Sequence, residues 1–256
     1  HGGAVATVDH STLMTGPYQT PLALGRDPLM AFFWVILAPV LFIYGAYEVT
    51  LSVTPEFTPG TSEEIDAYQL LWRLHCVAIA LWFALMSLWS NWVGAGPFAG
   101  EMQTTSPWLI AAGFLGPLIF VIPGLLIGSL MPDEQWQYRT EIDTSIFAPQ
   151  NWTLAYIFAH VLIAPIVEEV AFRGVGMGAL IARGLSPIGA VVLTSAAFAF
   201  MHIQYSIPAM IIVFFAGVGF AVLRLVSGTV AVPIVAHIAA NTFVFYLNWA
   251  AANPAT

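Results

Sequence analysis

Charge is scarce in this chain of 256 residues. Only 8% of the residues are Asp, Glu, Lys or Arg, while 59% are hydrophobic. Because an average soluble domain carries about 25% charged residues, this composition excludes an ordinary soluble protein. The chain is expected to be embedded in a membrane and surrounded by its lipids.

Basic residues and cysteine are scarcer still. Lysine is absent, the formal net charge is −8, and the only cysteine is Cys76. Without a basic patch to neutralise phosphates, nucleic acid is excluded as a partner. One cysteine excludes an internal disulfide and a multi-cysteine zinc site. The six basic residues are Arg26, Arg73, Arg139, Arg173, Arg183 and Arg224.

Long apolar stretches, separated by polar or Gly/Pro-rich breaks, dominate what remains. They are long enough to cross a bilayer core of about 30 Å as helices, and they lack the alternation of barrel strands. We therefore predict an all-α fold, a polytopic membrane helix bundle forming one domain over 29–256 behind an irregular lead-in at 1–28. Seven spans are expected, at about residues 29–53, 68–93, 107–130, 152–183, 187–203, 206–224 and 230–250.

The arginines predict how the chain is oriented. Seven crossings put four of the six at or near the face that holds the N-terminus, and basic residues favour the cytoplasmic side. The N-terminus is therefore expected in the cytoplasm. An eighth membrane element within 131–151 would reverse the terminal half. Because the lysine-free, Ala/Gly/Arg-leaning composition resembles that of a high-GC bacterium, we expect the bacterial inner (plasma) membrane.

The fourth span carries three ionisable residues in apolar surroundings, in the pattern Glu168-Glu169-x-x-x-Arg173. Each costs roughly 2.5–3.5 kcal/mol to insert and therefore needs a partner, a cavity or a function. Glu169 and Arg173 are four residues apart and share a helix face. Glu168 points about 100° away from Glu169, which predicts one paired carboxylate and one facing a cavity. The alternative is a buried ion-pair network that only fixes helix packing.

Two later spans supply further polar groups, His202 in Phe198-x-x-x-His202 and the pair His237-x-x-x-Asn241. A carboxylate and a histidine can activate water for peptide hydrolysis. A second histidine and an amide can stabilise the oxyanion, each donor being worth roughly 3–4 kcal/mol. Alternatively, one glutamate with two histidines is a catalytic zinc set, here Glu168, or Glu169, with His202 and His237.

These three motifs, in this order on successive apolar spans, resemble the CPBP (CAAX protease and bacteriocin-processing) family of intramembrane proteases. That family includes the type II CAAX prenyl endopeptidases and the lysostaphin-resistance-A-like (Abi) proteins. The resemblance covers about residues 152–247. Other membrane-protease signatures, His-Glu-x-x-His and Gly-x-Ser-Gly, are absent from the sequence.

The resemblance also implies a role for each motif residue and a membrane-associated peptide or protein as substrate. Glu168 would be the general base, acting on water together with His202. Glu169 and Arg173 would support it. His237 and Asn241 would form the oxyanion site.

Two other functions stay open. The chain could be a catalytically silent accessory subunit of a larger membrane complex, with other membrane proteins as partners. It could also handle protons or solutes, using the same buried groups as a relay. Two further histidines in apolar segments, His75 and His160, fit none of the motifs.

Helix lengths give the depth of each site residue. At about 1.5 Å rise per residue, Glu168 lies about 18–22 Å and His202 about 22 Å from the cytoplasmic ends of their spans, but His237 only about 12 Å. His237 is thus expected about 10 Å away in depth from the other two, unless tilt or a kink at Pro165 or Pro233 closes the difference.

Overall fold

The computed structural model describes residues 33–53, 62–92, 107–132, 157–182, 184–202 and 205–252, and these contain helices and no strands. The lead-in at 1–28, most of the loop at 131–151, and Arg26, Arg139 and Arg183 lie outside the described residues. The helices, with π-helical segments labelled η, are η1 (Phe33–Leu37), α4 (Ala38–Val53), α5 (Ser62–Trp92), α6 (Pro107–Ser129), η5 (Phe158–Ile163), α9 (Ala164–Glu169), η6 (Val170–Gly176), α10 (Met177–Ala182), α11 (Pro187–Phe200), α12 (Ile207–Ser227) and α13 (Ala231–Ala252).

The all-α prediction is confirmed for the described residues, and the helices follow the expected spans closely. Three stretches are long and apolar enough to cross a membrane: Phe33–Thr50, Gln69–Trp89 and Ile207–Ser227. The apolar helices Pro187–Phe200 and Ala231–Leu247 are shorter. The count of seven or eight spans therefore stays a prediction.

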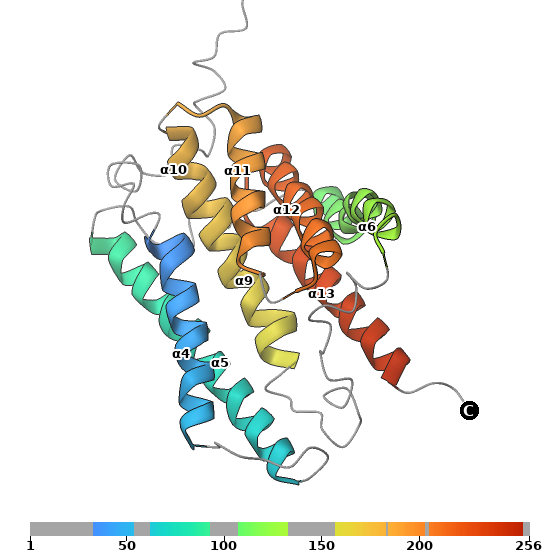
Figure 1. The fold of residues 1–256 in the computed structure, drawn as a ribbon. Helices are drawn as coiled ribbons and strands as arrows, with labels where there is room; N and C mark the ends of the chain where they lie inside the picture. Colours follow the sequence, from blue (N-terminus) through green and yellow to red (C-terminus); the bar gives the residue numbers. More distant parts are fainter. Residues whose placement is uncertain are drawn as a thin grey trace, which may run out of the picture.

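One central rod, formed by η5, α9, η6 and α10 in succession, organises the bundle (Figure 1). Helices α4 and α5 lie side by side on one flank of the rod, and α11, α12 and α13 lie on the other. Helix α6 packs on the outside of α12 and α13. The rod carries the Glu168 motif, so both flanks can reach the ionisable residues.

Two of the π-helical segments end just before a proline, η1 before Pro39 and η5 before Pro165. Proline has no N–H, and its ring clashes with the carbonyl four residues earlier. In a membrane the freed backbone groups are satisfied by local 3₁₀ or π adjustments. The wider turns therefore follow from the proline positions, and they shift the helical register of the residues beyond them.

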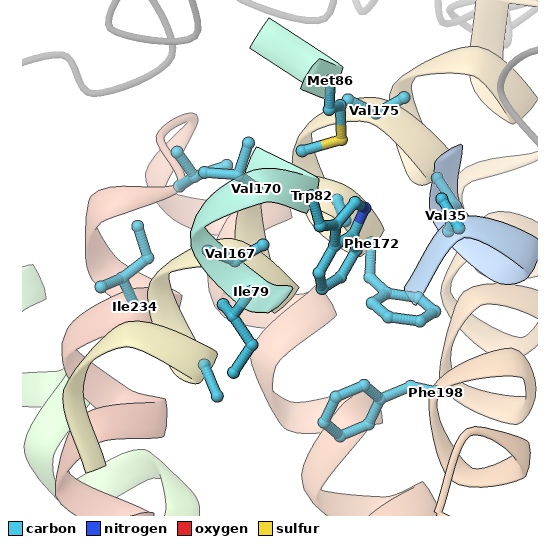
Figure 2. Close-up of a cluster of buried hydrophobic side chains, with 14 of the residues drawn as sticks. Val35, Ile79, Trp82, Met86, Val167, Val170, Phe172, Val175, Phe198 and Ile234 are labelled. Carbon is cyan, nitrogen blue, oxygen red and sulfur yellow. The ribbon is translucent and has the colours of Figure 1, made fainter. Parts of the chain in front are cut away.

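The buried core surrounds the rod (Figure 2). Val170, Phe172 and Val175 of the rod are at most 1% exposed and pack against both flanks. Their neighbours from other helices include Val35, Ile79, Trp82, Met86, Phe198 and Ile234. Apolar packing thus holds the rod on all sides, leaving little room for water near its ionisable residues.

Helix α6 approaches its neighbours through glycine. A Cβ on Gly124 would lie 2.7 Å from Ile212 Cα of α12, and one on Gly113 would lie 3.1 Å from the Val232 carbonyl oxygen of α13. Small residues permit such close backbone approach in lipid, where helix association depends on packing. The large exposed side chains of α6, such as Trp108 and Leu126, are apolar and suit a lipid environment.

We predict that Gly124→Ala lowers the free energy of unfolding by about 1–3 kcal/mol, because the added methyl group forces two backbones apart. The matched control is Gly45→Ala in α4, where a Cβ would meet nothing within 4 Å. The control should be neutral, or more stable by up to about 1 kcal/mol through helix propensity. Thermal unfolding in detergent measures both, and equal midpoints for the two variants would contradict the packing described.

Candidate active site

Glu169 is the most deeply buried ionisable residue of the rod, with no exposed surface. Its Oε1 accepts hydrogen bonds from Arg173 Nη1 at 3.0 Å and from His237 Nδ1 at 2.9 Å. The first bond confirms the predicted pairing of residues four apart on one helix face. Because this carboxylate has no exposed surface and one oxygen already accepts two hydrogen bonds, it is poorly placed to accept a proton from water.

Arg173 is buried with its partner, at 1% exposure. Nη2 donates to the Gly217 carbonyl oxygen of α12 at 2.8 Å. The guanidinium carbon also lies 4.7 Å from the ring centre of Phe198, 5.5 Å from that of Phe220 and 5.8 Å from that of Phe172. Such cation–π contacts stabilise a desolvated guanidinium by about 2 kcal/mol.

Gly217 is a site residue that sequence reasoning missed. A Cβ there would come within 3.2 Å of Arg173 Nη2 and 3.3 Å of Ser195 Cβ. Glycine therefore lets the α12 backbone carbonyl reach the guanidinium. Nothing in the local sequence separates Gly217 from its neighbour Gly219, so a single sequence could not have singled it out.

Glu168 faces away from this buried pair. Its side chain is 20% exposed, and it borders a small cavity that His202 also borders. The cavity is of about the size of one water molecule. The structure thus agrees with the prediction that one carboxylate, Glu169, is paired and the other, Glu168, faces a cavity. The residues around the cavity are Pro39, Trp82, Glu168, Phe172, Phe198, Met201 and His202.

His202 follows the end of α11 and borders the cavity. Its Nδ1 lies 2.8 Å from the Phe198 carbonyl oxygen, and a carbonyl can only accept, so Nδ1 carries the proton. The ring packs against those of Phe198 and Tyr205, with centroids 4.8 and 5.2 Å away. In the neutral ring Nε2 is then the free acceptor.

His237 lies between the two carboxylates. Its Nδ1 bonds to Glu169, and its Nε2 is 3.7 Å from Glu168 Oε2. The ring stacks on Phe220, with centroids 4.6 Å apart and planes 21° apart. The expected depth difference of about 10 Å between His237 and Glu168 is therefore wrong.

The reason for that error is where α13 begins. Gly228 ends α12 in the left-handed conformation, with φ of 71°, which glycine adopts without strain. The chain then turns inside the protein, since Thr229 and Val230 are at most 1% exposed. Helix α13 thus starts in the interior, whereas counting residues had placed its start at the membrane face.

Asn241 lies one turn beyond His237 on α13. Its Nδ2 donates to the His160 carbonyl oxygen at 2.8 Å. This bond joins α13 to η5, and the second amide hydrogen is not used by it. His160 itself packs edge-on against Trp72 of α5, with ring centroids 4.6 Å apart.

The structure brings five of the six predicted residues around one point, and fixes Asn241 beside them through the His160 backbone. Among the described residues, no group of three or more His, Cys, Asp or Glu side chains is arranged to hold a metal ion. Glu168, His202 and His237 are all described and are not arranged as such a group.

Comparison with known proteins gives one family match. The family model for type II CAAX prenyl endopeptidase Rce1-like proteins matches residues 150–243, a range that contains all six predicted site residues. The chain is also 27% identical over 224 residues to an uncharacterized 24.3 kDa protein of Escherichia coli, covering 85% of this chain and 95% of that protein. No solved structure matches.

This match agrees with the motif resemblance and with the apolar helices. At family level it indicates a membrane protease that acts on a peptide or protein. The motifs Glu168-Glu169-x-x-x-Arg173, Phe198-x-x-x-His202 and His237-x-x-x-Asn241 all fall within the matched range. Residues 150–243 are therefore similar to the Rce1-like family, which is consistent with the CPBP family that the motifs predict.

Proposed function

We propose that this protein is an intramembrane endopeptidase that hydrolyses a peptide bond of a membrane-associated protein or peptide. The observation that carries the proposal is the water-sized cavity bordered by both Glu168 and His202. A carboxylate and a histidine acceptor on one water are what general-base hydrolysis requires. The aromatic wall keeps the surroundings apolar, which strengthens each electrostatic interaction within the site.

In this mechanism Glu168 takes one proton from the water as the water oxygen attacks the scissile carbonyl carbon. His202 Nε2 accepts a hydrogen bond from the same water and fixes its direction. The carbonyl electrons move onto the carbonyl oxygen, giving the tetrahedral oxyanion. Glu168 then delivers its proton to the leaving nitrogen as the C–N bond breaks, so that a carboxylic acid and an amine are released.

His237 and Asn241 are proposed to bind the oxyanion. For His237 to donate from Nε2 while Nδ1 donates to Glu169, the ring must carry both protons. Its Nε2 lies 3.7 Å from Glu168 Oε2, on the side of the proposed base. The unused amide hydrogen of Asn241 supplies the second donor.

The setting proposed for this reaction is the bacterial inner membrane, with the N-terminus in the cytoplasm. The distribution of arginines supports this orientation through the positive-inside rule. Within α12, Arg224 lies in the last turn, where a basic side chain also suits the helix dipole.

We expect Glu168→Gln to lower kcat for peptide cleavage by about 10²- to 10⁴-fold, because the amide cannot accept the proton of water. The measurement is cleavage of a membrane-anchored peptide by purified protein in liposomes. Stability should change little, since the Glu168 side chain is partly exposed. Wild-type cleavage rates in this variant would rule out Glu168 as the base.

Glu169→Gln, an identical change at the neighbouring residue, should instead act on stability. It removes the charge that Arg173 and His237 both contact, and breaking a buried ion pair costs about 3–5 kcal/mol. Thermal unfolding in detergent, with Glu168→Gln as the matched control, measures the difference. If both variants unfolded at the same temperature, the two carboxylates would not differ as described.

For Asn241→Ala we expect kcat to fall by about 10²- to 10³-fold if its amide stabilises the oxyanion. The matched control is Thr242→Ala, the next residue of α13, whose hydroxyl bonds only to its own helix at Ile238. Kinetics and unfolding are measured together. A lower unfolding temperature with unchanged kcat would mean that Asn241 only joins α13 to η5.

A further inference from the structure

One wall of the cavity comes from the part of the chain that the family model does not match. Pro39 of α4 and Trp82 of α5 face the same cavity as Glu168 and His202. Both lie outside residues 150–243. Helices α4 and α5 therefore form this wall, and the similarity to the family model does not extend to it.

Trp82 is the larger of the two wall residues and is held rigidly. It is 2% exposed, and its indole Nε1 donates to the Trp34 carbonyl oxygen at 2.9 Å. In Figure 2 its ring lies beside Phe172 and close to Val35, with Phe198 further along the same face. A large ring fixed by both packing and a hydrogen bond sets the position of this wall.

The space that Trp82 leaves is only about that of one water molecule. A scissile carbonyl must come within reach of this water, and the side chain next to the carbonyl must then fit against the indole. A small side chain can do so without moving the wall. A large one requires the ring, and with it α5, to shift.

We propose that Trp82 is a specificity-determining residue that admits only a small side chain, such as that of Gly, Ala or Ser, next to the scissile bond. The substrate part of this proposal rests on the proposed peptidase function. The structural part, that the indole narrows the cavity beside Glu168, is independent of catalysis and can be measured without a substrate.

Trp89 provides a matched control on the same helix. It lies two turns beyond Trp82, is also buried, and packs against the Trp34 ring with centroids 6.2 Å apart. It does not border the cavity. Trp82→Leu and Trp89→Leu therefore remove the same volume from one helix, and only the first enlarges the space beside Glu168.

The first test is chemical access to Glu168. The full chain in detergent is treated with dicyclohexylcarbodiimide, an apolar reagent for carboxyl groups, and the adducts are counted by peptide mass spectrometry. Trp82→Leu should raise labelling of Glu168 several-fold over wild type and over Trp89→Leu. Glu169, which is fully buried, serves as the internal reference and should stay unlabelled. Equal labelling of Glu168 in the two variants overturns the proposal.

The second test is cleavage of membrane-anchored peptides that differ only in Ala, Leu or Phe beside the scissile bond. Wild type and Trp89→Leu should prefer Ala, whereas Trp82→Leu should shift the kcat/KM ratio toward Leu by about tenfold or more. An unchanged ratio overturns the specificity role even if labelling rises. If the leucine variants fail to fold, Trp82→Phe and Trp89→Phe replace them.

The two tests separate this proposal from the proposed function. If the wild type cleaves no peptide but Trp82→Leu raises the labelling of Glu168, the peptidase function and the substrate preference are both wrong. The structural role of Trp82, which narrows the cavity beside Glu168, is still supported. If the wild type cleaves and labelling does not change, the peptidase function stands and the role of Trp82 fails.

Discussion

The buried ion pair between Glu169 and Arg173 is the interaction on which the rest of the site depends. Both side chains are removed from solvent, and a desolvated charge is tolerated only with a close partner and further hydrogen bonds. The helices around the rod supply them. Helix α12 gives the Gly217 carbonyl oxygen, and α13 gives His237. The ion pair therefore decides which residues of α12 and α13 face the centre.

The same pair also explains how two adjacent glutamates differ. Glu169 is occupied by two donors, whereas Glu168, about 100° further round the helix, borders the cavity with His202. His237 contacts both carboxylates, so the buried charges and the water site are electrostatically linked. A structural ion pair and a reactive carboxylate are thus placed by consecutive residues of one helix.

The helical fold could be predicted from the length of the apolar stretches. The Glu169–Arg173 pair and the cavity-facing Glu168 could be predicted because they follow from 3.6-residue periodicity. The depth of His237 was predicted wrongly, since the sequence does not tell that the chain after Gly228 turns through the buried residues Thr229 and Val230. Gly217 and Trp82 were missed for a related reason. Each acts through a contact between helices far apart in the chain, and nothing local distinguishes it from other glycines or tryptophans of the spans.

A double-mutant cycle on the free energy of unfolding measures whether Arg173 is paired with Glu169 and not with Glu168. It combines Arg173→Met with each glutamate replaced by glutamine in turn, and reports how strongly each carboxylate is coupled to the guanidinium. We expect a coupling of about 2–3 kcal/mol or more for Glu169 and less than about 0.5 kcal/mol for Glu168. Equal coupling of both carboxylates to Arg173 would contradict this pairing.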